Sequence, residues 1–202
     1  MPLESMWTVK GQDHIISELS GSISQNKLSH AYLITGPKHI GKHTLAKELA
    51  QAVNCISTGV IGPCRECRQC NRISFNQHSD VQIVNIDTGK KDALSRNDIG
   101  INEIRNLQRQ INFQPYEGSC RVFIIDDADH MTEEASNALL KMLEEPPSSL
   151  LILLLAPSVD TLLTTVVSRC RLLKMRPLTS SEIRQELMEK YNTNSQHAIK
   201  LA

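Results

Sequence analysis

The sequence of 202 residues has no long apolar run. Its most apolar stretch, Leu150 to Ala156, is far too short to cross a bilayer, which takes about 20 apolar residues. The segment Met1-Pro-Leu-Glu-Ser5 lacks the basic region and apolar core of a secretory signal. We therefore expect a cytoplasmic protein with no membrane partner.

Aromatic residues and net charge are also scarce. With only three Phe, three Tyr and one Trp, the core must rely on aliphatic side chains, and base-stacking platforms for single-stranded nucleic acid are not predicted. The 22 basic and 22 acidic residues cancel, so the net charge gives no indication of broad electrostatic binding to nucleic acid. Any contact with DNA is expected to be local or shared with partner subunits.

Apolar segments typical of buried strands alternate with segments of helical periodicity. Residues 45–53 and 101–111 each place their apolar side chains on one helical face. This alternation predicts an α/β fold with a parallel sheet covered on both faces. The expected strands are Ala31–Thr35, Val81–Ile86, Val122–Ile125, Leu150–Leu155 and, more weakly, Arg171–Met175.

The sheet-forming domain is predicted to end near the last strand. Asp87–Asp98 is polar and is interpreted as a loop. Pro177 follows the last strand, and Thr179-Ser-Ser-Glu182 has the form of a capping box that begins a helix. We predict one domain over residues 1–176 and the beginning of a second, truncated domain over residues 177–202, because about 25 residues are too few to fold alone.

The segment Gly36-Pro-Lys-His-Ile-Gly41-Lys42 lies between an expected strand and an expected helix, which is the context of a phosphate-binding loop. Glycines allow backbone N–H groups to face phosphates, the helix N-terminus favours anions, and Lys42 would reach the β and γ phosphates. His43 stands where a hydroxyl usually binds Mg²⁺, and Thr44 comes one position late. The pattern predicts phosphate binding without the usual Mg²⁺ coordination; a chance Gly-rich turn is the alternative.

Two carboxylates follow the apolar strand Val122–Ile125. Asp126 would hold Mg²⁺ directly or through water, and Asp127 would orient an attacking water. An acidic turn is the alternative, but the preceding phosphate loop favours a nucleotide site. Asp127 is one methylene shorter than the Glu that motor ATPases usually carry, so its reach is reduced.

Four thiols within sixteen residues predict a structural zinc site at about residues 55–72, because closely spaced cysteine pairs supply a tetrahedral set of thiolates. All four ligands come from protein, which leaves no open position for water. The spacing alone also permits an iron–sulfur cluster. Cys120 and Cys170 are interpreted as buried small apolar residues. The expected ligands are Cys55, Cys64, Cys67 and Cys70.

Ser168-Arg169-Cys170 ends a helix-like segment directly before the last expected strand. A lone arginine is by default a surface charge. The alternative is an arginine finger that stabilises charge on the nucleotide of a neighbouring subunit. The pattern alone favours the surface charge.

Together these segments resemble the bacterial clamp-loader subunits of the AAA+ family, of the DNA polymerase III γ/τ and δ′ type. The resemblance begins at Gly11-Gln12, continues through Leu28–Leu33, the phosphate loop and the four-cysteine insertion, includes Asn137–Pro147 and ends on Ser168-Arg169-Cys170. It implies a P-loop AAA+ (RecA-like) three-layer domain with an inserted four-cysteine zinc module and the start of a helical lid. It also makes Arg169 the finger presented to the ATP of the adjacent subunit.

Three departures from the motor pattern favour the δ′ type. His39 replaces an internal glycine, His43 replaces the hydroxyl residue and Asp127 replaces Glu. Leu153–Ser158 also lacks the Thr-Thr or Thr-Asn pair that many motors carry there. The resemblance thus implies a subunit of the DNA polymerase III holoenzyme in DNA replication, with a degenerate ATP and Mg²⁺ site of its own. The implied partners are the γ/τ and δ subunits, the sliding clamp and, through the assembly, primed DNA.

Two other functions remain open at this point. The first is a γ/τ-like motor subunit that hydrolyses ATP with Lys42, Thr44 and Asp126 in its own site. The second is a zinc-stabilised AAA+ adaptor outside replication.

Overall fold

The computed structural model describes residues 6–57, 61–86, 98–111 and 113–191. Five strands form one sheet in the order β2-β3-β4-β1-β5, and every neighbouring pair is parallel. The expected strands are confirmed, with bounds that differ by one or two residues at some ends. They are β1 Ala31–Thr35, β2 Val81–Val84, β3 Arg121–Ile125, β4 Leu150–Ala156 and β5 Arg171–Lys174.

Burial along the strands follows their place in the sheet. The three central strands β3, β4 and β1 are buried at every residue, whereas the edge strands β2 and β5 are partly exposed. Central parallel strands are covered by helices on both faces, so they consist of continuous apolar residues. The most apolar stretch of the sequence, Leu150 to Ala156, is therefore the central strand β4.

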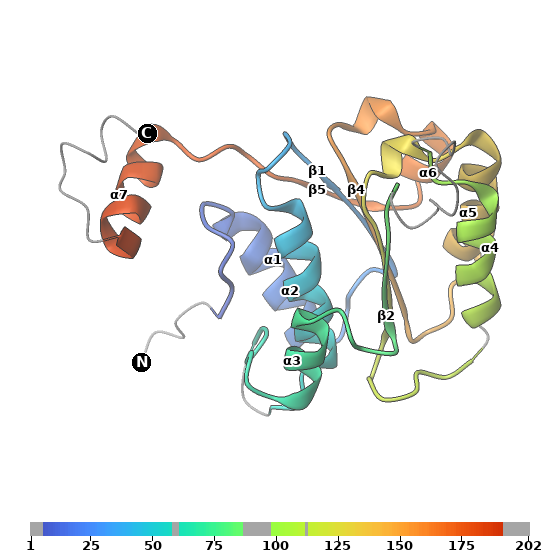
Figure 1. The fold of residues 1–202 in the computed structure, drawn as a ribbon, viewed down its shortest axis with the longest axis horizontal. Coiled ribbons are helices and arrows are strands. Elements are labelled where there is room, and N and C mark those ends of the chain that lie inside the picture. The colour runs from blue at the N-terminus through green and yellow to red at the C-terminus, as the bar shows by residue number, and fades with distance from the viewer. Residues whose placement is uncertain (1–5, 58–60, 87–97, 112, 192–202) are drawn as a thin grey trace.

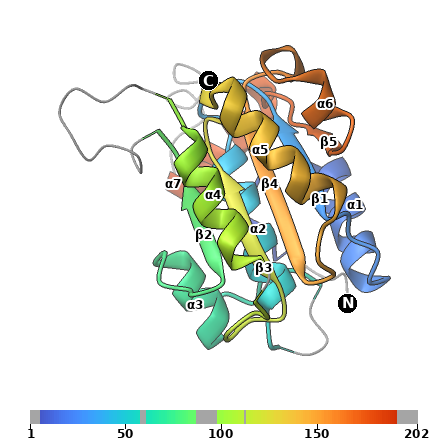
Figure 2. The same cartoon turned by 90° about the vertical axis from the view of Figure 1, so that its right-hand side faces the viewer.

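Helices cover both faces of the sheet (Figures 1 and 2). On β1, Tyr32 and Ile34 pack into one core cluster with α1, α2 and α3, whereas Leu33 packs into a second cluster with α4, α5 and α6. The predicted three-layer α/β fold is thus confirmed. The helices are α1 Asp13–Ser24, α2 Lys42–Asn54, α3 Arg68–Ser74, α4 Ile101–Gln110, α5 Glu133–Glu144, α6 Thr164–Val167 and α7 Ser180–Tyr191, with 3-10 turns η1 Ala128–His130 and η2 Val159–Thr161.

Helix α7 stands apart from the sheet (Figure 1). It begins with the predicted capping box: the backbone N–H of Thr179 donates to Glu182 Oε2 at 2.7 Å, and the N–H of Glu182 donates to Thr179 Oγ1 at 3.3 Å. An ion pair of 3.3 Å between Lys10 and Glu186 joins α7 to the N-terminal segment. The domain boundary at residue 176 stays a prediction, and residues 192–202 of the predicted second domain lie outside the described residues.

Two other expectations concern loops and membranes. The predicted loop Asp87–Asp98 lies outside the described residues except for Asp98. Among the residues that the structure describes, no helix is long and apolar enough to cross a membrane.

A buried ion pair holds one corner of the domain together. The side chain of Asp80 is 0% exposed and lies 3.1 Å from the guanidinium of Arg121, which is 10% exposed. Asp80 also accepts hydrogen bonds from the backbone N–H groups of Tyr116, Glu117 and Gly118 at 2.7 to 2.9 Å. Burial alone would raise the pKa of Asp80, but these N–H donors and Arg121 hold it below its ordinary value.

Replacing Asp80 with alanine is expected to lower the free energy of unfolding by about 3–5 kcal/mol, because Arg121 would remain buried without its partner. Urea denaturation measures this change. Because the folded-state pKa of Asp80 is depressed, its contribution is present above the unfolded pKa of about 3.9 and disappears as the pH falls through the folded pKa. The exposed Asp160→Ala variant is the control, with a change within about 0.5 kcal/mol. An equal effect of both variants would contradict the prediction.

Candidate functional site

The phosphate loop connects the end of β1 to the start of α2. Gly41 adopts a φ of 100°, and a Cβ at Gly36 would lie 3.2 Å from Met175, so both positions suit glycine. His39 has a φ of 65°, a left-handed conformation that costs a residue with a side chain about 1–2 kcal/mol. The resemblance leads one to expect glycine at position 39, and glycine would adopt this backbone conformation with less strain than His39 does.

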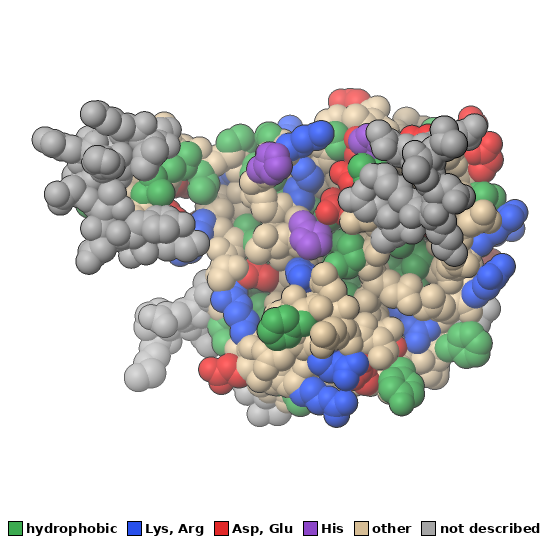
Figure 3. Space-filling view, viewed as in Figure 1, with side chains coloured by type: hydrophobic (Ala, Val, Ile, Leu, Met, Phe, Trp, Pro, Cys, Tyr) green, Lys and Arg blue, Asp and Glu red, His purple; other side chains and the backbone are tan. Residues whose placement is uncertain are grey.

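A pocket of about 570 Å³ lies at the carboxyl ends of the strands, between this loop and the segment after β3. It brings together six of the seven residues predicted for nucleotide binding, whereas the seventh, Gly36, lines a neighbouring pocket. Figure 3 shows basic, acidic and histidine side chains gathered in the upper middle of the molecule. The six residues are Gly41, Lys42, His43, Thr44, Asp126 and Asp127.

Lys42 is held by the loop that precedes it. Its Nζ donates to the carbonyl oxygens of Gly36 at 2.7 Å and Pro37 at 2.9 Å. Burial lowers the pKa of Lys42, and nearby aspartates, with Asp126 the strongest, oppose that effect. The ammonium group would exchange these carbonyl acceptors for phosphate oxygens on binding a nucleotide.

The carboxylates after β3 have different surroundings. The N–H of Asp126 continues the sheet by donating to the carbonyl of Val84 at 2.8 Å, and Asp126 Oδ1 accepts from the N–H of Asp127 at 3.1 Å. Asp127 has a φ of 56° and precedes η1. Burial, followed by the charge of Asp126, raises the pKa of Asp127.

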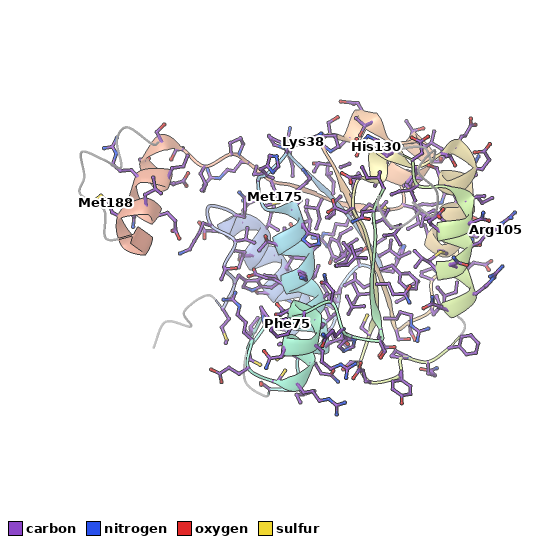
Figure 4. The ribbon with its side chains drawn as sticks, in the orientation of Figure 1. Lys38, Phe75, Arg105, His130, Met175 and Met188 are labelled. Carbon is purple, nitrogen blue, oxygen red and sulfur yellow. The ribbon has the colours of Figure 1, made fainter. Side chains whose placement is uncertain are left out.

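A second pocket, of about 670 Å³, lies on the other side of the loop and was missed by sequence reasoning. Gly36 and Pro37 form part of its wall, and His14, Met175 and Pro177 line it from distant segments. No local motif joins these residues, so no sequence pattern could have identified the pocket. Figure 4 labels Lys38 and His130 from the first pocket and Met175 from the second.

The predicted four-cysteine cluster is assembled by the fold: the four Sγ atoms lie within 4.8 Å of one another. The Sγ atoms of Cys64 and Cys70 are 3.8 Å apart, and a tetrahedron with Zn–S bonds of about 2.3 Å has S···S edges of about 3.8 Å. Backbone N–H groups of Cys67 and Cys70 donate to the sulfurs of Cys64 and Cys67 at 3.3 and 3.4 Å. Cys55, Cys64, Cys67 and Cys70 can therefore bind one metal ion.

Hydrogen bonds favour the thiolate of Cys64. Burial raises its pKa, but hydrogen bonds from Ser57 and from the backbone of Cys67 and Glu66 outweigh burial and lower the pKa to about 6. A metal ligand must be deprotonated, so a thiolate at neutral pH suits metal binding.

The cysteine module is attached to α2, the helix that begins at the phosphate loop. Arg65 forms an ion pair of 2.8 Å with Glu48, and Gln51 Nε2 donates to the carbonyl of Cys70 at 2.8 Å. Glu48 also accepts from the backbone N–H of Thr8 at 2.9 Å. The module therefore packs against α2 and is tied through Glu48 to the N-terminal segment; Figure 1 shows α3 next to the lower end of α2.

The two other cysteines lie outside the cluster, as predicted. Cys120 packs against the first core cluster and Cys170 against the second, and both are partly buried. Burial raises the pKa of each thiol to about 12.

Arg169 lies between α6 and β5, as predicted, and its side chain is 36% exposed. In the parallel pairing of β5 with β1, Arg171 lies opposite Tyr32, at the start of the strand, whereas the phosphate loop follows Thr35 at its end. The strands between these points rise about 10 Å. Arg169 therefore lies at the amino edge of the sheet, opposite the edge that bears this chain's own phosphate pocket.

Comparisons with known proteins agree with this architecture. The protein family described as DNA polymerase III, delta subunit, matches residues 11–179. DNA polymerase III subunit tau of Bacillus subtilis is 38% identical over 175 residues, which cover 87% of this chain and 30% of the relative. Subunit delta′ of the same organism is 36% identical over 178 residues, covering 88% and 51%. The chain thus spans about half or less of the length of these relatives.

Solved structures share the fold. A gamma subunit-related protein of DNA polymerase III from Thermotoga maritima has a TM-score of 0.59 at 24% identity, covering 91% of this chain and 57% of that one. The RuvB Holliday junction branch migration motor of Thermotoga maritima has a TM-score of 0.53 at 13% identity, covering 88% and 49%. These likenesses support the fold alone, whereas the family match covers most of the chain. The chain belongs to the bacterial DNA polymerase III clamp-loader subunits of the AAA+ family.

Proposed function

We propose that this protein is a δ′-like subunit of the replicative clamp loader. It supplies Arg169 to the ATP of a neighbouring motor subunit and so helps load the sliding clamp on primed DNA. The observation that carries the proposal is the position of Arg169, which is partly exposed at the amino edge of the sheet and remote from the phosphate pocket of its own chain. An arginine so placed can act only in trans.

The chain's own pocket is suited to binding more than to hydrolysis. Gly41 and Lys42 would hold phosphates, and the second pocket beside the loop would take the base and ribose. Asp126 would bind Mg²⁺, but His43 presents imidazole nitrogen where this hard cation prefers oxygen. Binding of ATP with weak or absent hydrolysis is the expected behaviour.

The proposed metal is zinc, in a structural role. Four thiolates fill a tetrahedral zinc shell, which leaves no position for a reacting water.

We also propose that the chain consists of an AAA+ domain over residues 1–176 and the start of a helical lid over residues 177–202. The γ/τ and δ subunits and the sliding clamp are the proposed partners.

A γ/τ-like motor is the second candidate. The tau and delta′ relatives are almost equally similar to this chain, at 38% and 36% identity. The raised pKa of Asp127 also suits a group that orients water. Sequence similarity therefore does not separate the two functions, and a mutation in the chain's own pocket is needed.

Replacing Lys42 with alanine in the full-length protein, reconstituted with the other loader subunits, is expected to leave ATPase turnover within about twofold, since a δ′-like subunit hydrolyses little ATP itself. The measurement is steady-state phosphate release in the presence of clamp and primed DNA. Lys47→Ala, on the same helix but outside both pockets, is the control. A loss of about 100-fold or more from Lys42→Ala alone would establish the motor function instead.

A further inference from the structure

The guanidinium group of Arg169 makes three contacts within its own chain. Its Nη2 lies 2.8 Å from Glu144 Oε1. Its Nη1 donates to the backbone carbonyl of Thr165 at 2.9 Å and to the hydroxyl oxygen of Ser168 at 3.4 Å. Glu144 is the last residue of α5, and Thr165 belongs to α6. Two helices that pack against each other thus hold one cation between their C-terminal ends.

The backbone on either side of Arg169 is also anchored. The hydroxyl of Ser168 donates to the carbonyl of Thr165 at 3.1 Å, and the N–H of Arg169 donates to the carbonyl of Val166 at 3.1 Å. Cys170 packs against the second core cluster. The main chain is therefore placed by α6 and the core, and the remaining freedom of Arg169 lies in its long side chain.

Glu144 does little for the helix on which it lies. A carboxylate at a helix C-terminus meets the negative end of the helix dipole, which disfavours it. The preceding residues Met142 and Leu143 are buried and hold this end of α5 in place, so the carboxylate projects from a rigid support. The positive charge of Arg169 offsets the negative charge of the Glu144 carboxylate and the partial negative charges at the C-terminal ends of α5 and α6.

We propose that Glu144 is a positioning residue for the arginine finger. This inference rests on the proposed function of Arg169. Glu144, the Thr165 carbonyl and the Ser168 hydroxyl use three of the five N–H donors of the guanidinium. Within the described residues the other two donors have no hydrogen-bond partner, so they can serve the phosphate oxygens of a neighbouring nucleotide. Glu144 restricts the conformations of the Arg169 side chain before the neighbouring subunit binds. Less conformational freedom of Arg169 is therefore lost in reaching the transition state.

The test measures ATPase kinetics of the full-length protein in the reconstituted loader. Glu144→Ala is expected to lower kcat about three- to fivefold, the size typical of an exposed ion pair, with KM for ATP unchanged. Glu144→Gln keeps an oxygen that can accept the same hydrogen bond and is expected to recover kcat to within about twofold. Glu145→Ala is the matched control: Glu145 is the adjacent exposed glutamate, for which the described residues provide no ion pair.

A double-mutant comparison with Arg169→Ala distinguishes a positioning role of Glu144 from a general effect of the mutation on stability. In an Arg169→Ala background, Glu144→Ala is expected to change nothing further, because the residue through which it acts is absent. The same loss in both backgrounds, or a rise in kcat from Glu144→Ala, would overturn the inference while leaving the finger itself intact. If Arg169→Ala alone has no effect on turnover, the proposed function fails and this inference fails with it.

Discussion

Replacing Arg169 with alanine is expected to lower ATP turnover of the reconstituted full-length loader by about 10³-fold while the complex still assembles. An arginine finger neutralises charge that develops on the transferred phosphoryl group, and its loss costs roughly 10³ to 10⁵ in kcat. Folding should be little affected, since the side chain loses an exposed ion pair to Glu144 and two hydrogen bonds, to the Thr165 carbonyl and the Ser168 hydroxyl. Phosphate release measures turnover, and size-exclusion chromatography measures assembly.

Two further variants make this test specific. Arg171 lies two residues later, is 49% exposed and pairs with Glu18 at 2.6 Å, so Arg171→Ala removes a similar charge outside the proposed role. It is expected to leave turnover within about twofold. Arg169→Lys keeps the charge but loses the planar fork of donors and should remain strongly impaired. Undiminished turnover of Arg169→Ala would sink the proposed function.

Replacing Cys70 with serine is expected to abolish binding of the single metal ion and to destabilise the fold strongly. Cys70 is buried, its sulfur lies 3.8 Å from that of Cys64, and its carbonyl accepts from Gln51 on α2. Structural zinc contributes about 10–16 kcal/mol of binding free energy in zinc-finger peptides, and binding of this kind is coupled to folding. Elemental analysis gives the metal content, and thermal unfolding gives the loss of stability.

Cys120→Ala is the control for the metal site, because Cys120 is a partly buried thiol outside the cluster. It is expected to retain one zinc per chain. Freshly purified wild-type protein without metal, or a Cys70→Ser variant that keeps its metal, would contradict the prediction. Visible absorbance together with labile sulfide would identify an iron–sulfur cluster instead of zinc.

Much of the fold could be predicted because its signals are local. Buried parallel strands are continuous apolar runs, so β1 was predicted with its observed bounds, and β4 ends one residue beyond its prediction. The capping box at Thr179 was predicted because its two partners are three residues apart. The four cysteines were likewise recognisable as a metal site, because cysteines that are close in the sequence can bring their sulfur atoms to one metal ion.

Contacts between distant segments could not be predicted. Asp80 meets Arg121 and the loop before it across about 40 residues, and Glu144 meets Arg169 across 25. The second pocket draws His14 and Met175 to the same loop. Each of these features depends on how strands and helices pack, and single residues carry no signal of that packing.

The chemical groups of this protein, and the strand or helix beside which each one stands, follow from the sequence alone: a lysine after a glycine loop, aspartates after a strand, four thiols, and an arginine before the last strand. The edge of the sheet at which each group lies depends on the fold. Parallel pairing of β5 with β1 places the phosphate loop at the carboxyl edge and Arg169 at the amino edge. Because a side chain cannot reach from one edge to the other, Arg169 does not contribute to this chain's own phosphate pocket.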